Sequence, residues 1–257
     1  MPEATVGAMT KKILLVTGAS RGIGAAVALA AAREGYRVAI NYVSDHKAAE
    51  KVAAAIEKAG SQALIVKADV AREAEINRLF EEIDKKLGRL THLVNNAGIV
   101  GRVSRLGAAD PAMIRQVIDL NVTGAILVAR EAVRRMSTAH GGEGGAIVNL
   151  SSAAATLGSP GEFTWYAASK GAIDSFTLGL ARELAKDGVR VNAVSPGLIE
   201  TDIHASGGEP DRVARMGPLI PMQRAGTADE VAEAILWLLS DKASYVTGAN
   251  IRVAGGR

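Results

Sequence analysis

Short runs of apolar, mostly β-branched residues alternate along the chain with longer stretches whose apolar residues recur at helical spacing. The pattern predicts strands at Ile13–Thr17, Arg37–Tyr42, Gln62–Lys67, His92–Asn95, Ala146–Leu150, Val189–Val194 and Asn250–Val253. It predicts helices over residues 22–34, 46–59, 72–87, 111–137, 164–187 and 227–240. This alternation is typical of an α/β fold in which helices cover both faces of a parallel sheet. We therefore expect one doubly wound domain with a seven-stranded parallel sheet.

Two segments fall outside this rhythm. Residues 198–221 are rich in Gly, Pro and polar residues and separate the sixth strand from the last helix. A loop of this length in a compact domain usually borders a binding site, so we predict a substrate loop here. Residues 1–10 are expected to form a disordered extension before a single domain of residues 11–257.

Composition narrows the classes of function. The formal net charge is only +3, and basic residues often lie one helical turn from an acid, as Lys86 does from Glu82. This indicates solvated helix faces and no nucleic-acid partner. The chain has no cysteine and no apolar run of membrane-spanning length, which favours a cytoplasmic protein without a membrane partner. Its four histidines lack ligand spacing, so no metal site is expected.

A glycine-rich turn follows the first predicted strand and opens an alanine-rich helix. The turn reads Thr17-Gly18-Ala19-Ser20-Arg21-Gly22-Ile23-Gly24. Glycines let a backbone turn tightly and approach a pyrophosphate, which the amides at a helix N-terminus then bind. A purely structural turn is the alternative, but the position between strand and helix favours a nucleotide site.

The end of the second strand bears on the choice of cofactor. An NAD site would place a carboxylate here to bind the ribose 2′-hydroxyl, whereas this chain has Tyr42, and Asp45 comes three residues later. Arg21 in the glycine loop offers a guanidinium to a 2′-phosphate. We predict NADP, with NADPH preferred over NADH. In the alternative, Asp45 only caps a helix and Arg21 only faces solvent.

A tyrosine, a lysine and a serine suggest acid/base chemistry. Tyr166 and Lys170 are four residues apart and share one face of a helix. A phenol has a pKa near 10, so acid/base work near neutral pH needs the phenolate to be favoured, and a nearby ammonium favours it. The fifth strand ends in Ser151 and Ser152, whose side chains point to opposite faces, so one of them is expected to reach a substrate oxygen.

Asn121 lies within the apolar stripe of predicted helix 111–137. A buried amide needs partners, and either a hydrogen bond to the core or a place in a proton relay would supply them. The other motifs all follow predicted strands at their carboxyl ends, the edge where open α/β sheets bind ligands. They are Gly18, Asp69, Asn95 to Gly98, Ser152 and Pro196-Gly197.

Taken together, these motifs resemble the short-chain dehydrogenase/reductase family in its shorter form, over residues 11–257. The resemblance rests on Asn121 and on T-G-A-S-R-G-I-G at 17–24, A-D-V at 68–70, N-N-A-G at 95–98, N-L-S-S at 149–152, Y-A-A-S-K at 166–170 and S-P-G-L-I-E-T at 195–201. It implies a Rossmann-type fold and a homotetramer.

The resemblance also implies roles for the catalytic residues. Tyr166 is the general acid/base and Ser152, the second serine of N-L-S-S, polarises the carbonyl. Lys170 binds the ribose hydroxyls and lowers the Tyr166 pKa, and Asn121 holds a water in a proton relay. The cofactor site implied is Gly18, Ser20, Arg21, Gly22, Ile23, Gly24, Asn41, Tyr42, Ser44, Asp69, Val70, Asn95, Ala97, Gly98, Tyr166, Lys170, Pro196, Gly197, Ile199 and Thr201.

Within that site, Asp69 is expected near the adenine, Ile199 and Thr201 near the carboxamide, and Arg21 as the mark of NADP preference. The chain departs from the family at one place, because Tyr166 follows Ser152 by 14 positions, a longer spacing than usual. The extra residue falls in Gly158–Phe163, at the mouth of the expected substrate pocket.

The predicted function is hydride transfer between NADP(H) and a small carbonyl or secondary alcohol. The alternative is a catalytically silent nucleotide-binding sensor or scaffold with the same fold. The family acts on 3-oxoacyl thioesters, sugars, steroids and small ketones, and residues 198–221 do not select among them.

Overall fold

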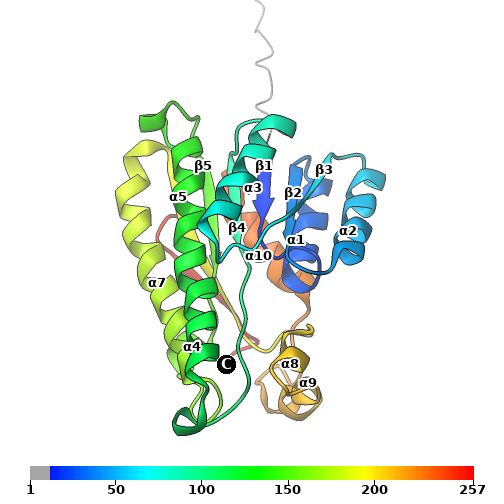
Figure 1. The fold of residues 1–257 in the computed structure, drawn as a ribbon, viewed down its shortest axis with the longest axis vertical. Helices are drawn as coiled ribbons and strands as arrows, with labels where there is room; N and C mark the ends of the chain where they lie inside the picture. The colour runs from blue at the N-terminus through cyan, green and yellow to red at the C-terminus, as the bar shows by residue number, and fades with distance from the viewer. Residues whose placement is uncertain (1–11) are drawn as a thin grey trace, which may run out of the picture.

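The computed structural model describes residues 12–257, and the extension predicted for residues 1–10 lies outside them. Seven strands form one parallel sheet in the order β3-β2-β1-β4-β5-β6-β7 (Figure 1). They are β1 Ile13–Val16, β2 Arg37–Tyr42, β3 Ala63–Lys67, β4 His92–Asn95, β5 Gly145–Leu150, β6 Val189–Pro196 and β7 Asn250–Val253. The expected Rossmann-type α/β fold is confirmed.

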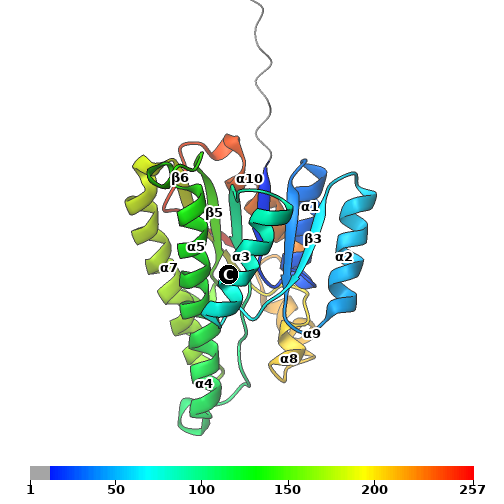
Figure 2. The same ribbon diagram turned by 45° about the horizontal axis from the view of Figure 1, so that its top comes forward.

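Helices cover both faces of the sheet (Figures 1 and 2). The α-helices are α1 Gly22–Arg33, α2 His46–Lys58, α3 Glu73–Lys86, α4 Pro111–Ile118, α5 Ala125–Met136, α6 Ala154–Leu157, α7 Thr164–Leu184, α8 Ile203–Ser206, α9 Arg212–Met216 and α10 Ala228–Leu239. Buried side chains of α1, α2 and α10 form one core layer, and those of α3, α5 and α7 form the other. The strands are apolar on both sides because both of their faces are buried.

The single helix expected over residues 111–137 is divided in the structure. Between α4 and α5, residues Asp119–Gly124 form a wider π-helical turn, which contains Asn121. A Cβ added to Gly124 would lie 2.4 Å from the Val70 oxygen, so the turn packs closely against the segment that follows β3. Turns of this kind are frequent at functional sites, and this one brings Asn121 toward the end of β4.

The expectation of no apolar run of membrane-spanning length was wrong for the helical run Pro111–Met136, which by length and composition alone is apolar enough to cross a membrane. It is the one such run among the described residues. In the structure it packs against α3, α7 and β4 as part of the domain.

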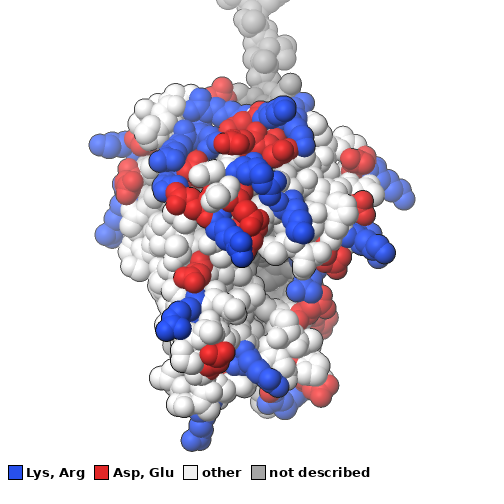
Figure 3. Space-filling model, viewed as in Figure 1, with Lys and Arg blue, Asp and Glu red and all other residues white. Residues whose placement is uncertain are grey.

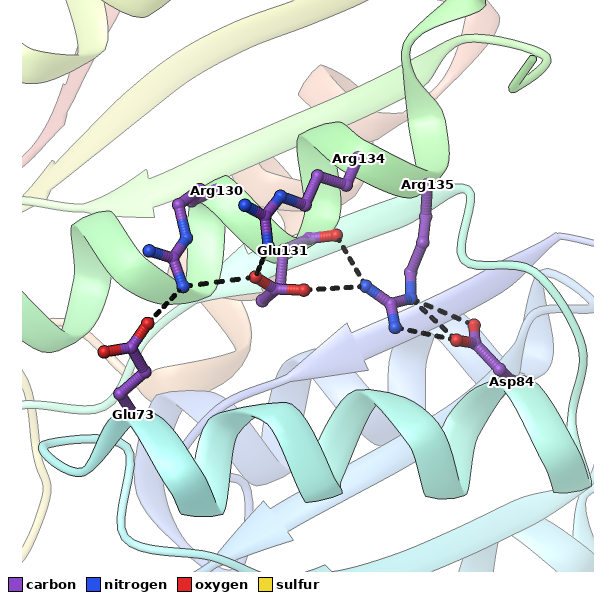
Figure 4. Close-up of polar contacts among 6 residues, drawn as sticks. All are labelled: Glu73, Asp84, Arg130, Glu131, Arg134 and Arg135. Atoms are coloured by element: carbon purple, nitrogen blue, oxygen red, sulfur yellow. Dashed lines mark hydrogen bonds and ion pairs between the residues drawn. The ribbon is translucent and has the colours of Figure 1, made fainter. Parts of the chain in front are cut away.

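The polar face of α5 is tied to α3 by an ion-pair network (Figure 4). Glu131 is buried and accepts from Arg134 at 2.7 Å and from Arg135 at 3.0 Å. Arg135 continues to Asp84 on α3 at 2.8 Å, while Arg130 continues to Glu73 at 2.6 Å. On the face shown in Figure 3, acidic and basic side chains are intermixed over these helices, as expected for solvated helix faces.

The predicted substrate loop is partly ordered into helix. Residues 198–221 contain the short helices α8 and α9, which lie beyond the carboxyl end of β6 and beside the C-terminus (Figure 1). His204 at the start of α8 anchors the loop, because its Nε2 lies 2.9 Å from the Ile199 oxygen. The loop is thus a folded wall at the edge of the sheet where the expected site residues gather.

Candidate functional site

The glycine loop is held in shape by close contacts with the end of β4. Gly18 has a φ of +63°, which a side chain would strain. A Cβ added to Gly24 would lie 2.6 Å from both Asn96 Nδ2 and the Gly18 oxygen, so only glycine fits there. Asn96 Nδ2 donates to the oxygens of Thr17 at 2.8 Å and Gly18 at 3.1 Å. These contacts fix the loop directly above the start of α1.

The first amides of α1 face the same space. No side chain caps the helix at Arg21, so its N-terminal amides have no side-chain partner at this position. Such amides and the positive end of the helix dipole bind phosphate groups. The uncapped helix and the glycine cradle together fit the pyrophosphate of a dinucleotide.

At the end of β2 the cavity wall carries a hydroxyl in place of a carboxylate. The Tyr42 hydroxyl lies 2.6 Å from His46 Nδ1, and His46 Nε2 lies 3.3 Å from Glu50. Asp45 caps α2 by accepting from the Ala48 amide at 2.9 Å, although it also lines the cavity. The helix-cap role considered for Asp45 therefore describes its observed contact.

Tyr166 and Lys170 both lie on α7 and are buried. Lys170 Nζ donates to the Leu150 oxygen at 2.6 Å and lies 5.7 Å from the centre of the Tyr166 ring. The Ser152 side chain hydrogen-bonds the Tyr166 phenol and accepts from the Ala154 amide at 3.1 Å. A phenol, an ammonium and a hydroxyl thus meet at the carboxyl end of β5.

Burial dominates the electrostatics of this cluster. It raises the pKa of Tyr166, and the hydrogen bond with Ser152 opposes that rise. Burial also lowers the pKa of Lys170 to about 8, which Asp174 opposes. The lowering of the Tyr166 pKa expected from Lys170 is therefore not the effect that dominates here. The phenol is held in its protonated form, ready to donate.

The two adjacent serines differ in their surroundings. Ser151 is buried, and its Oγ donates to the Lys170 oxygen at 3.3 Å. It also hydrogen-bonds Asp174 and so faces away from the Tyr166 phenol. Ser152 faces the phenol.

Asn121 is buried and its polar atoms have protein partners. Its Oδ1 accepts from the Ile99 amide at 2.9 Å, and its Nδ2 donates to the Ile99 oxygen at 2.8 Å and to Ser169 Oγ at 3.1 Å. A Cβ added to Gly98 would meet Asn121 Oδ1 at 3.2 Å and Lys170 Nζ at 3.6 Å. Asn121 therefore makes the core contact considered for it. Gly98 separates its side chain from the Lys170 ammonium.

One cavity of about 840 Å³ joins these parts. Among the predicted site residues, those along its wall are Gly18, Ser20, Arg21, Gly22, Ile23, Asn41, Tyr42, Ser44, Asp69, Val70, Ala97, Gly98, Ser152, Tyr166, Lys170, Pro196, Gly197, Ile199 and Thr201. Gly24, Asn95 and Asn121 are not on the wall. Asn95 Nδ2 donates to the Ala125 oxygen at 2.8 Å, so this side chain joins β4 to α5.

The far end of the cavity, beyond Tyr166, is formed by residues that sequence reasoning did not select. They come from the segment before α7 and from the substrate loop, among them Glu162, Phe163, His204, Arg212 and Met216. The expectation that residues 198–221 border the site gave the general location of His204, Arg212 and Met216, and the expectation that Gly158–Phe163 lies at the mouth of the pocket gave that of Glu162 and Phe163. No motif marked the individual side chains.

Comparisons with known proteins agree with this site. Residues 18–257 match the family model described as Enoyl-(Acyl carrier protein) reductase. An uncharacterized oxidoreductase, YgfF, of Escherichia coli is 54% identical, covering 95% of this chain and 99% of the relative. A 3-oxoacyl-[acyl-carrier-protein] reductase of Synechocystis is 40% identical, covering 97% and 98%. A Burkholderia cenocepacia short chain dehydrogenase solved in complex with NADP is 34% identical, with a TM-score of 0.88 over 95% of this chain and 97% of that one.

The buried ammonium predicts a stability that depends on pH. Because the folded-state pKa of Lys170 is about 8, below the usual lysine value of 10.5, folding at lower pH requires a charge to be buried. We expect Lys170→Met to raise the free energy of unfolding at pH 7 by roughly 1–3 kcal/mol. The gain should shrink as pH rises from 8 toward 10.5, where the unfolded chain also loses the proton.

Chemical denaturation at several pH values measures this effect. Lys186→Met, at an exposed position of the same helical stretch, is the matched control and should show no such trend. A Lys170→Met variant that is less stable than the wild type at pH 7 would show that Lys170 contributes more through its contacts than burial of its charge costs.

Proposed function

The chain belongs to the short-chain dehydrogenase/reductase family, and we propose that it is an NADP(H)-dependent oxidoreductase that interconverts a carbonyl compound and a secondary alcohol. The observation that carries the proposal is the junction of Ser152, Tyr166 and Lys170 with the glycine cradle in one cavity. NADPH would supply the hydride for reduction at that junction. The alternative, a silent nucleotide-binding sensor, would not require a buried phenol and ammonium beside the cradle.

The proposed reduction uses the protonation states that burial favours. A substrate oxygen accepts hydrogen bonds from Ser152 and Tyr166, which aligns the carbonyl and polarises it. Tyr166 then donates its proton to that oxygen as it becomes an alkoxide. Lys170 stabilises the phenolate that remains and binds the ribose, and Asn121 supports proton return through a water. Glycine cradle amides and Arg21 bind the phosphates.

Relatives named 3-oxoacyl-[acyl-carrier-protein] reductases make 3-oxoacyl thioesters one candidate class of substrate beside small ketones. We keep the cytoplasmic location expected from the sequence as part of the proposal. A scan of 3-oxo esters and ketones, followed by NADPH absorbance, tests for activity.

We expect Tyr166→Phe to reduce turnover by about a hundredfold or more, because it keeps the ring and removes the transferable proton. The measurement is kcat with NADPH and a ketone accepted by the wild type. NADPH binding, followed by cofactor fluorescence, should be nearly unchanged. If the Tyr166→Phe variant keeps the wild-type kcat, Tyr166 is not the general acid.

We expect NADPH to be preferred over NADH, because Arg21 borders the site and no carboxylate ends β2 at Tyr42. Tyr42→Asp should then lower kcat/KM for NADPH more than for NADH, since the new carboxylate repels the 2′-phosphate. The ratio of the two values is the measurement. A wild-type preference for NADH would contradict the proposed cofactor.

We expect Ser152→Ala to lower kcat by about a hundredfold, because it removes a donor to the developing oxyanion. Ser151→Ala should cost much less activity and act through stability, given its contacts with Lys170 and Asp174. Both variants are compared in kcat and in thermal stability. If Ser151→Ala lowers kcat more than Ser152→Ala does, the active hydroxyl is that of Ser151.

We further propose that the protein is a homotetramer, as the family resemblance implies. Ile126 on α5 and Leu178 on α7 expose 38% and 42% of their surface, although each helix also covers the sheet. Apolar side chains beyond the core-facing stripe suit helices that also pack on a partner subunit. Light scattering at micromolar concentration should give four times the chain mass, and a monomer mass would contradict the proposal.

A further inference from the structure

The substrate end of the cavity is closed by an ion pair between two segments that are distant in sequence. Arg212 on α9 donates to both oxygens of Glu162, at 2.9 Å and 2.6 Å. The Arg212 side chain is 8% exposed and that of Glu162 is 31% exposed. This is a two-pronged guanidinium–carboxylate pair, the geometry that arginine uses to bind planar anions.

The pair is coupled to the proposed reaction centre through one aromatic ring. The Arg212 guanidinium lies over the Phe163 ring at 5.1 Å, and Phe163 meets the Tyr166 ring edge-on with centres 5.7 Å apart. A third segment, which follows β4, joins the other two through two backbone hydrogen bonds. The Ser104 amide donates to the Glu162 oxygen at 2.9 Å, and the Val103 amide donates to the Gly207 oxygen at 3.2 Å. The pair therefore stands one side chain away from the phenol that would protonate the substrate.

Glu162 lies in Gly158–Phe163, the segment expected from the family resemblance at the mouth of the substrate pocket, and it lines the cavity. The hydrogen bonds from Arg212 lower the pKa of its carboxyl, and the charges of Arg215 and Arg257 lower it further. Arg212 also lines the cavity. Glu162 thus neutralises a guanidinium that would otherwise present a cation to the substrate.

We propose that Glu162 and Arg212 are specificity-determining residues: their ion pair cancels the charge of the Arg212 guanidinium in the cavity wall, so that the pocket accepts carbonyl compounds without charge near the carbonyl and disfavours carboxylates. This inference rests on the proposed oxidoreductase function for its substrate. The Arg212 guanidinium is the group that would bind a substrate carboxylate, but both of its outer nitrogens already donate to Glu162. The apolar neighbours Phe163 and Met216 suit the uncharged part of such a substrate.

The test compares a keto ester with the corresponding keto acid, which share a carbonyl and differ by one charge. Wild type should favour the ester in kcat/KM. Glu162→Gln frees the guanidinium, and the ester-to-acid ratio should fall by about tenfold or more, the scale of a hydrogen bond to a charged group. The double variant Glu162→Gln/Arg212→Met lacks the free guanidinium, so its ester-to-acid ratio should not show this fall. An unchanged ratio in a Glu162→Gln protein that still binds NADPH would overturn the proposal.

Glu209→Gln is the matched control. Glu209 also lines the cavity and pairs with an arginine of α9, Arg215, but that ion pair is more exposed. The variant removes the same charge from the wall of the same cavity and should leave the ratio unchanged. An equal fall in both variants would show a general effect of net charge and would also overturn the proposal.

Arg212→Met gives an independent variant in case Glu162→Gln does not fold. It leaves the Glu162 carboxylate unpaired, so the keto acid should be rejected more strongly and an amino ketone accepted better than its neutral analogue. No change in either preference would count against the ion pair as a determinant of specificity.

Benzoate, with benzamide as the neutral comparison, provides a readout without turnover. Benzoate should raise the melting temperature of Glu162→Gln and not that of the wild type or of Glu209→Gln, and benzamide should not distinguish the three. If the wild type reduces neither the ester nor the acid, the proposed function fails, while the benzoate result still decides whether Glu162 masks an anion site.

Discussion

Parallel pairing of buried strands is the constraint on which the arrangement of this molecule depends. Every pairing in the sheet is parallel, so all seven strands end at one edge. Main-chain groups that leave the sheet at this edge need new partners, and the loops that begin there supply them. Asn96 fulfils this need for the glycine loop, and Lys170 fulfils it for the end of β5. The cavity is the space that these loops leave between them.

The same burial that builds the fold sets the chemistry of the site. Tyr166 and Lys170 are buried on α7, so the neutral phenol is favoured over the phenolate and the Lys170 ammonium is a stronger acid than it is in water. A neutral phenol suits donation to a carbonyl oxygen. The cost falls on stability, because the Lys170 ammonium is buried beside Tyr166, with the Leu150 oxygen as its hydrogen-bond partner and Asp174 favouring its charge.

The two ends of the cavity are built by different means. The end that we propose binds the cofactor uses backbone amides, glycines and strand ends, which any chain with this sheet can present. The end that we propose binds the substrate uses side chains from α9 and from the segment before α7, held by Glu162 and Arg212. Specificity can therefore vary at the second end without disturbing the first.

The features of the fold and of the candidate site that depend on local pattern were predictable from the sequence alone. Strand and helix periodicity defined the seven strands, and parallel topology followed from their alternation with helices. The glycine loop and the Tyr166–Lys170 spacing were also readable, because each lies within one element or one turn. The sequence could not show that a π-helical turn divides helix 111–137, since that turn depends on close packing of Gly124 against Val70.

The side-chain environments and the contacts between distant segments were set by the tertiary structure. It placed Asn95 in the core and gave Ser151 and Ser152 their different neighbours, because both depend on which face of a strand end meets α5 or α7. It brought Glu162 to Arg212 across 50 residues of chain. An ion pair between distant segments leaves no periodicity in a single sequence. It exists only because the fold returns both segments to the same edge of the sheet.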